Sequence, residues 1–196
     1  MTRLMTQRRE AILTAMNEVE GIAGLADIDR ATLVQIEKIL ARLAARDELF
    51  RAEDFPPPED PKRDSNMYEL WRDARDAVTL YASVAPPGLE TPPHNHGTWA
   101  AIAGIRGVES NDFYRRALSG DLEKMHTIEV RRGSVIGMLA GEVHSIRILP
   151  TPEPFFSLHL YGLPFERTRR EYRDATTGSW VAFTARPNIR HYRLQD

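Results

Sequence analysis

The chain contains no cysteine, and this absence excludes disulfides, thiolate metal sites and cysteine nucleophiles together. Any bound metal must therefore be held by histidine, aspartate, glutamate or water. Long apolar runs are also missing, since no stretch approaches the roughly 20 apolar residues that span a bilayer. The first residues, MTRLMTQRRE, lack the apolar centre of a signal peptide. We therefore expect a cytoplasmic protein without a membrane partner.

A strong excess of charge of either sign is missing as well. The formal net charge is -2, which argues against nucleic acid as the main partner and favours a small molecule. A length of 196 residues with 42% hydrophobic residues suits one structural domain with a sizeable core. Nothing in the composition indicates an oligomeric state.

The N-terminal third has helical periodicity. Apolar residues recur three or four positions apart in two stretches, the second of them preceded by Asp29 as a candidate N-cap. These residues are Ile12, Leu13, Met16 and Val19, then Leu33, Ile36, Leu40 and Leu43. Residues 53–66, EDFPPPEDPKRDSN, read as a proline-rich linker, and residues 68–75 as a short helix or turn. We expect residues 1–66 to pack as helices and linker on a barrel formed by residues 67–196.

Beyond Ala77 the hydrophobic period changes to two, which is typical of strands. Candidate strands are residues 78–84, 98–106, 108–116, 122–130, 134–138, 143–149, 155–161 and 180–185. No long helix interrupts them, so the pattern argues against βαβ crossovers and a parallel sheet. Short strands with close turns predict an antiparallel sandwich or barrel, and a barrel can hold one small ligand.

His94 and His96 lie two positions apart in a stretch that otherwise reads as strand. On a strand both imidazoles would share one face, and imidazole is a common ligand of first-row metals. The pair therefore predicts half of a metal site, with an exposed His-x-His as the alternative. His126 and His191 have no partner at metal spacing, and we expect both to be surface or structural residues.

The glycine and histidine spacing around this pair resembles the first cupin motif, from Gly88 through His94 and His96 to Gly107. A second cupin motif runs from Gly133 through Gly141 to His144. The resemblance implies a mainly β, jelly-roll type antiparallel barrel, here with an N-terminal helical region.

The chain departs from the general cupin pattern in ways that matter for the metal. Ala100 stands where a metal-binding glutamate is usual, and Leu139 and Ile148 replace the usual proline and asparagine. A three-histidine site remains. A carboxylate ligand from elsewhere stays open as an alternative, although no candidate sits at the motif position. The candidates are Glu90, Glu109 and Glu142.

The segments ARDELF, TPPHNHGTWA, GEVHSI and SLHLYG resemble those of bacterial 3-mercaptopropionate dioxygenases, relatives of cysteine dioxygenase. The resemblance covers most of the chain. It implies one Fe(II) per chain, held by the three histidines His94, His96 and His144.

The same resemblance implies a hydrogen-bonded relay of Ser157, His159 and Tyr161 beside the iron. The alternative for these three residues is a solvated strand face. In some cysteine dioxygenases the relay tyrosine is cross-linked to a cysteine, and the position that resembles the one of that cysteine is occupied here by Ala100. Because the chain has no cysteine, Tyr161 must be unmodified.

The function implied is oxidation of a small thiol by O2 to a sulfinate, with both oxygen atoms ending on sulfur. Three neutral imidazoles leave the full dipositive charge on iron, which favours an anionic thiolate as ligand. The alternative is a metal-binding cupin without dioxygenase activity, either a sensor or binding module or an enzyme that uses another metal.

The substrate depends on an arginine. In 3-mercaptopropionate dioxygenases an arginine shortly after the relay tyrosine binds the substrate carboxylate, and Arg170 lies nine residues after Tyr161. The earlier position used by cysteine dioxygenase holds Leu70, although Arg72 and Arg75 are near it. We therefore expect Arg170 to bind a carboxylate-bearing thiol, 3-mercaptopropionate ahead of cysteine. The alternative is that the arginine cluster is a solvated loop or short helix.

Overall fold

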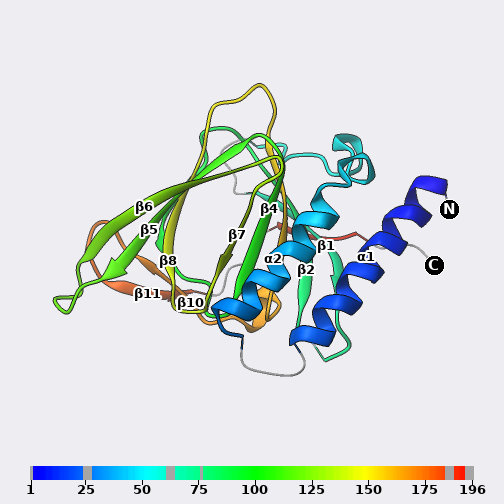
Figure 1. Cartoon of the computed structure of the whole chain (residues 1–196). Coiled ribbons are helices and arrows are strands. Elements are labelled where there is room, and N and C mark those ends of the chain that lie inside the picture. Colours follow the sequence, from blue (N-terminus) through cyan, green and yellow to red (C-terminus); the bar gives the residue numbers. More distant parts are fainter. Residues whose placement is uncertain (1, 24–27, 61–64, 76, 184–187, 193–196) are drawn as a thin grey trace.

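The computed structural model describes residues 2–23, 28–60, 65–75, 77–183 and 188–192. Two helices precede two facing six-stranded sheets, and both helices lie outside the barrel (Figure 1). No helix in the described part of the chain is long and apolar enough to cross a membrane.

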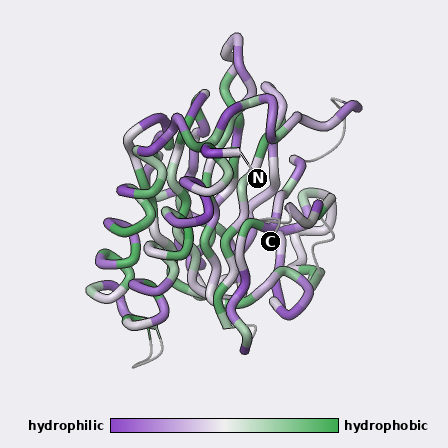
Figure 2. Tube along the Cα trace, turned by 90° about the vertical axis from the view of Figure 1, so that its right-hand side faces the viewer, coloured by the Kyte–Doolittle hydropathy of each residue, from purple (hydrophilic) through white to green (hydrophobic). Residues whose placement is uncertain are grey.

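The helices form where the apolar periodicity predicts them. They are α1 (Arg3–Ala23) and α2 (Arg30–Ala44), followed by 3₁₀ turns at Asp47–Leu49 and Ala52–Asp54. Asp29 caps α2, because its carboxylate accepts a hydrogen bond from the backbone N–H of Thr32 at 2.7 Å. Hydrophilic and hydrophobic residues alternate along both helices (Figure 2). The apolar faces pack in one core with the outer face of the first sheet.

The first sheet contains, in order, β12 (Asn188–His191), β1 (Asn66–Arg72), β2 (Thr79–Ala85), β9 (Phe155–Tyr161), β4 (Ala100–Arg106) and β7 (Val135–Met138). The second contains β11 (Trp180–Phe183), β10 (Arg170–Arg173), β3 (Glu90–His94), β8 (Val143–Ile148), β5 (Val108–Arg116) and β6 (Leu122–Arg131). A second hydrophobic core lies between the sheets and takes residues from both, such as Ile102 and Ile148. The predicted strands correspond to β2, β4 to β9 and β11, although residues 184 and 185 lie outside the described residues.

One expectation about the strands was wrong for most of its range. Residues 68–72 belong to β1, which is hydrogen-bonded on both sides, to β2 and β12, whereas residues 74 and 75 form a turn. The named strands pair antiparallel, as the sequence predicted, except that β1 pairs with β12 in parallel. In the sequence, strands β2 to β11 come between β1 and β12. This long stretch of chain takes the place of the helical crossover that usually connects parallel strands.

Candidate metal and substrate site

Three histidines meet between the sheets. His94 ends β3 and lies opposite His144 of β8, whereas His96 lies in the loop after β3, so the expectation of one shared strand face was wrong. A turn at Gly97 folds this loop, with φ of 63° and no space for a side chain, because a Cβ there would lie 2.2 Å from the carbonyl oxygen of Arg169. One ring nitrogen from each histidine lies within 4.8 Å of the others, and all three residues are buried.

The hydrogen bonds of His94 and His144 leave the Nε2 atoms of these two rings for a ligand. His94 Nδ1–H donates to the carbonyl of Pro92 at 2.9 Å, and His144 Nδ1–H donates to the amide oxygen of Asn111 at 2.9 Å. Both Nε2 atoms therefore carry lone pairs, and Nε2 of His144 lies 3.3 Å from Nε2 of His96. His96 Nδ1 is buried without a hydrogen-bond partner among the described residues, so in the absence of a metal Nε2–H of His96 can donate to Nε2 of His144. A metal ion would replace that proton and take a lone pair from each ring. The donor set therefore fits a metal ion.

Burial keeps these imidazoles neutral. It lowers the pKa of His94 to about 3 and holds the pKa values of His96 and His144 well below the usual 6.5, with the charge of Arg170 adding to the effect. Metal binding requires neutral imidazole, so the ligand atoms are available at neutral pH without loss of protons.

A buried polar pair supports His144 from behind. Asn111, whose oxygen accepts from His144, donates from Nδ2 to the Glu109 carboxylate at 3.0 Å, and both residues are buried on β5. Burial raises the pKa of Glu109 to about 7, against the opposing effect of the Asn111 hydrogen bond. Glu109 was considered as a carboxylate ligand, but the structure places it in the pocket lining as a partner of Asn111, outside the group of three histidines. The E-x-N spacing on one strand face was the only sequence signal for this pair.

Ser157, His159 and Tyr161 line one face of β9 as a continuous hydrogen-bonded chain. Ser157 Oγ lies 2.8 Å from His159 Nε2, and His159 Nδ1 lies 2.9 Å from the Tyr161 hydroxyl. All three are buried, so they do not form a solvated face. The Tyr161 ring centroid is 5.4 Å from that of His96, which places the chain beside the histidine group.

Burial fixes the protonation states of His159 and Tyr161 in this relay. Burial lowers the pKa of His159 to about 3 and raises the pKa of Tyr161 above its usual value. A neutral His159 has one N–H, so one of its ring nitrogens donates a hydrogen bond while the other accepts one. When Nδ1–H donates to the Tyr161 oxygen, the phenol proton is free to point into the pocket.

Arg170 begins β10 and is only 8% exposed. Its guanidinium lies 5.2 Å from the ring centroid of Phe165 and 5.5 Å from that of Phe183, and its Nε donates to the carbonyl of Asn95 at 3.5 Å. No carboxylate among the described residues forms an ion pair with Arg170. Burial lowers the pKa of its guanidinium. A buried cation without an anionic partner is costly, so the site is suited to an anionic ligand.

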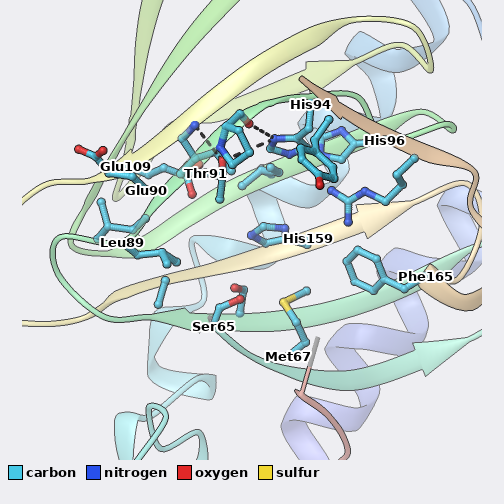
Figure 3. A pocket seen from close by; sticks show the side chains of 18 of the residues that line it. Ser65, Met67, Leu89, Glu90, Thr91, His94, His96, Glu109, His159 and Phe165 are labelled. Carbon is cyan, nitrogen blue, oxygen red and sulfur yellow. Dashed lines mark hydrogen bonds between the residues drawn. The ribbon is translucent and has the colours of Figure 1, made fainter. Parts of the chain in front are cut away.

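His94, His96 and His159 line one pocket of about 400 Å³, whereas His144 and Ser157 are not among its lining residues. Figure 3 shows His94, His96 and His159 in its middle, with Phe165 toward one end and Glu90 and Glu109 toward the other. Tyr161 and Arg170 also line it, and apolar side chains such as Leu89 and Ile146 complete the wall.

Other residues considered from the sequence lie elsewhere. Glu142 forms an ion pair with Arg30 at the surface, and Leu70 is a core residue. Arg72 pairs with Glu69 and Glu166, and Arg75 pairs with Asp73, so neither replaces Arg170 in the pocket lining. His126 is exposed and stacks on Phe113, whereas the side chain of His191 lies outside the described residues.

No known protein-family model matches the chain. Among solved structures, it is similar to DMSP lyase DddQ from Ruegeria pomeroyi, with 20% identity and a TM-score of 0.38 over 48% of this chain and 42% of the lyase. A double-stranded beta-helix domain protein from Klebsiella pneumoniae has 14% identity and a TM-score of 0.44, over 69% of this chain and 91% of that one. Hydroquinone 1,2-dioxygenase PnpCD has 9% identity and a TM-score of 0.42, over 53% and 67%. At these values the comparisons assign no activity.

The sheet topology and the histidine group nevertheless define a class. The chain has the mainly β, cupin-type barrel predicted from its sequence, preceded by an N-terminal helical region. Between its sheets lies a buried three-histidine group that can bind a metal ion.

Proposed function

We propose that this protein is a mononuclear non-haem iron thiol dioxygenase. In this proposal it converts a small carboxylate-bearing thiol, 3-mercaptopropionate ahead of cysteine, and O2 to the sulfinate. The observation that carries the proposal is the buried guanidinium of Arg170, which has no carboxylate partner among the described residues and lines the same pocket as His94 and His96, two of the three neutral histidines. A molecule that has both a carboxylate and a soft anionic donor satisfies both groups at once.

His94, His96 and His144 would hold Fe(II), one per chain, through their Nε2 atoms. Bound there, ferrous iron would supply activation of O2 and stabilisation of a thiolate. Because no carboxylate among the described residues joins the group, the charge available to attract a thiolate is undiminished. The resemblance to thiol dioxygenases favours iron over other divalent metals.

Arg170 would orient the substrate. A planar guanidinium holds a carboxylate through two parallel hydrogen bonds, which fixes the direction of the rest of the molecule. The rings of Phe165 and Phe183 contact the guanidinium and help to bury it. Fixing both ends of a short substrate turns an encounter of separate reactants into a reaction within one complex.

The overall reaction needs no external reductant. The thiol R–SH and O2 give R–SO2H, so sulfur loses four electrons, dioxygen gains them, and two S–O bonds replace the O–O bond. Tyr161 would donate its hydroxyl proton to a developing negative charge on oxygen, with His159 and Ser157 setting the direction of that hydroxyl.

The test measures oxygen uptake and sulfinate formation by the iron-loaded protein with 3-mercaptopropionate, cysteine and cysteamine. We expect two oxygen-18 atoms from labelled O2 in each sulfinate. Arg170→Ala should raise the KM for 3-mercaptopropionate on the order of 10- to 100-fold, the range expected for a lost charged hydrogen bond. Arg170→Lys should recover little, because lysine lacks the paired donors.

Cysteamine provides the internal control, because it has no carboxylate to lose. Its KM should change little in Arg170→Ala. If cysteamine is the better substrate of the parent protein, or both thiols suffer equally, Arg170 does not bind a carboxylate. If no thiol is oxidised although the protein retains a metal, the protein is a metal-binding cupin of another function.

A further inference from the structure

Asn95 lies between two of the three histidines and is tied to the strand that carries Arg170. It is 7% exposed, and its backbone N–H donates to the carbonyl of Glu171 at 3.0 Å. Its side-chain oxygen accepts from the N–H of Glu171 at 3.0 Å, and its Nδ2 donates to the Glu171 carboxylate at 3.2 Å. We call these three hydrogen bonds the Asn95–Glu171 clasp.

The clasp connects the two protein segments that would bind the two ends of the proposed substrate. On one side of it, His94 and His96 are the peptide neighbours of Asn95, and on the other side Arg170 is the neighbour of Glu171. The carbonyl of Asn95 also accepts from Arg170 Nε at 3.5 Å. Strand pairing adds little, because β3 and β10 share a single register pair, His94 with Tyr172. The clasp therefore supplies most of the hydrogen bonds that hold the histidine loop at a set position relative to the guanidinium.

We infer that Asn95 is a positioning residue that sets the spacing between the metal and Arg170, and thereby selects the chain length of the mercapto acid. This inference rests on the proposed function. A thiolate at the metal and a carboxylate at Arg170 must span one distance, and one methylene more or less changes that span. Displacement by about 1 Å in such a site can cost about 100-fold in rate.

Asparagine is suited to this position by its paired donor and acceptor. Glu171 presents a backbone N–H and a carboxylate on one side, so the partner needs an acceptor and a donor on one side chain. Alanine would remove both hydrogen bonds of the side chain. Aspartate would keep the acceptor but set its second oxygen against the Glu171 carboxylate.

The test uses cobalt-loaded protein under nitrogen, so that binding is measured without turnover. Dissociation constants of mercaptoacetate, 3-mercaptopropionate and 4-mercaptobutyrate are read from the thiolate-to-cobalt absorption band. In the parent we expect one chain length to bind on the order of tenfold or more tightly than the others, as for one methylene in a shaped pocket. In Asn95→Ala this preference should fall to about threefold or less, with one cobalt still bound per chain.

A double variant that exchanges the amide and the carboxylate between positions 95 and 171 distinguishes a positioning role of Asn95 from a contribution to fold stability. Asn95→Asp should lose the preference, and adding Glu171→Gln to Asn95→Asp should restore it, because glutamine supplies the donor that aspartate now needs. Glu171→Gln alone is the matched control and should keep the preference, since its amide oxygen still accepts from Asn95.

An unchanged chain-length profile in Asn95→Ala, or a double variant that does not recover the preference, would overturn the inference. If Asn95→Ala fails to hold cobalt, the double variant alone decides. Failure of the proposed function has a different signature, because the parent protein would then bind none of the three mercapto acids at the metal.

Discussion

Glu109 is a buried carboxyl group, and replacing it with glutamine should change how stability depends on pH. Burial raises the pKa of Glu109 from the usual 4.5 to about 7. Between these two values the folded protein keeps a proton that the unfolded chain has released, so stability falls as pH rises from 4.5 to 7 and is constant above 7. At about 1.4 kcal/mol for each unit of pKa, the parent loses about 3 kcal/mol over this window.

Glu109→Gln keeps an oxygen that accepts from Asn111 but cannot ionise. The difference in unfolding free energy between variant and parent should therefore shift by about 2 to 3 kcal/mol in favour of the variant between pH 5 and pH 8. Urea unfolding of the metal-free proteins at both pH values measures it. The buried histidines titrate in both proteins and cancel in the difference, as does any constant effect of the amide. Parallel pH dependences would show that Glu109 ionises as freely in the folded protein as in the unfolded chain.

Three further predictions concern the metal and the relay. His144→Ala should lose most bound iron, measured by elemental analysis of the purified protein, and a variant that kept iron and activity would exclude His144 as a ligand. Asn111→Ala should weaken metal affinity on the order of 10- to 100-fold in chelator competition, because the orienting acceptor of the His144 ring is lost. Unchanged affinity would exclude that role. Tyr161→Phe should retain iron but form less sulfinate for each O2 consumed, and equal coupling in variant and parent would remove Tyr161 from the mechanism.

Local sequence patterns predicted much of the fold and part of the candidate site. Helices α1 and α2 followed from apolar periodicity, and the cap at Asp29 from residue type alone, because these features depend on neighbours three or four positions away. Ser157, His159 and Tyr161 could be placed on one face because the strand period is two. Their role, like that of the histidines, came from the resemblance and stays a prediction.

The sequence misled where a residue's environment comes from distant segments. Residues 68–75 have no clear period of their own, and β1 exists because β2 and β12 supply hydrogen bonds on both sides. His96 was expected on a strand, but Gly97 and the approach of Arg169 turn the chain away after His94. Hydrogen-bond partners far along the chain decide both cases.

By itself, the sequence determined the strand and helix periods, the histidine spacing and the presence of an arginine after Tyr161. Only the tertiary structure decided that Arg170 is buried without a carboxylate partner among the described residues, that Asn111 joins His144 to Glu109, and that Asn95 joins the histidine loop to β10. The reason is physical. Periodicity is a property of neighbouring residues, whereas the desolvation of a charge and the choice of a hydrogen-bond partner depend on segments that meet only when the barrel closes.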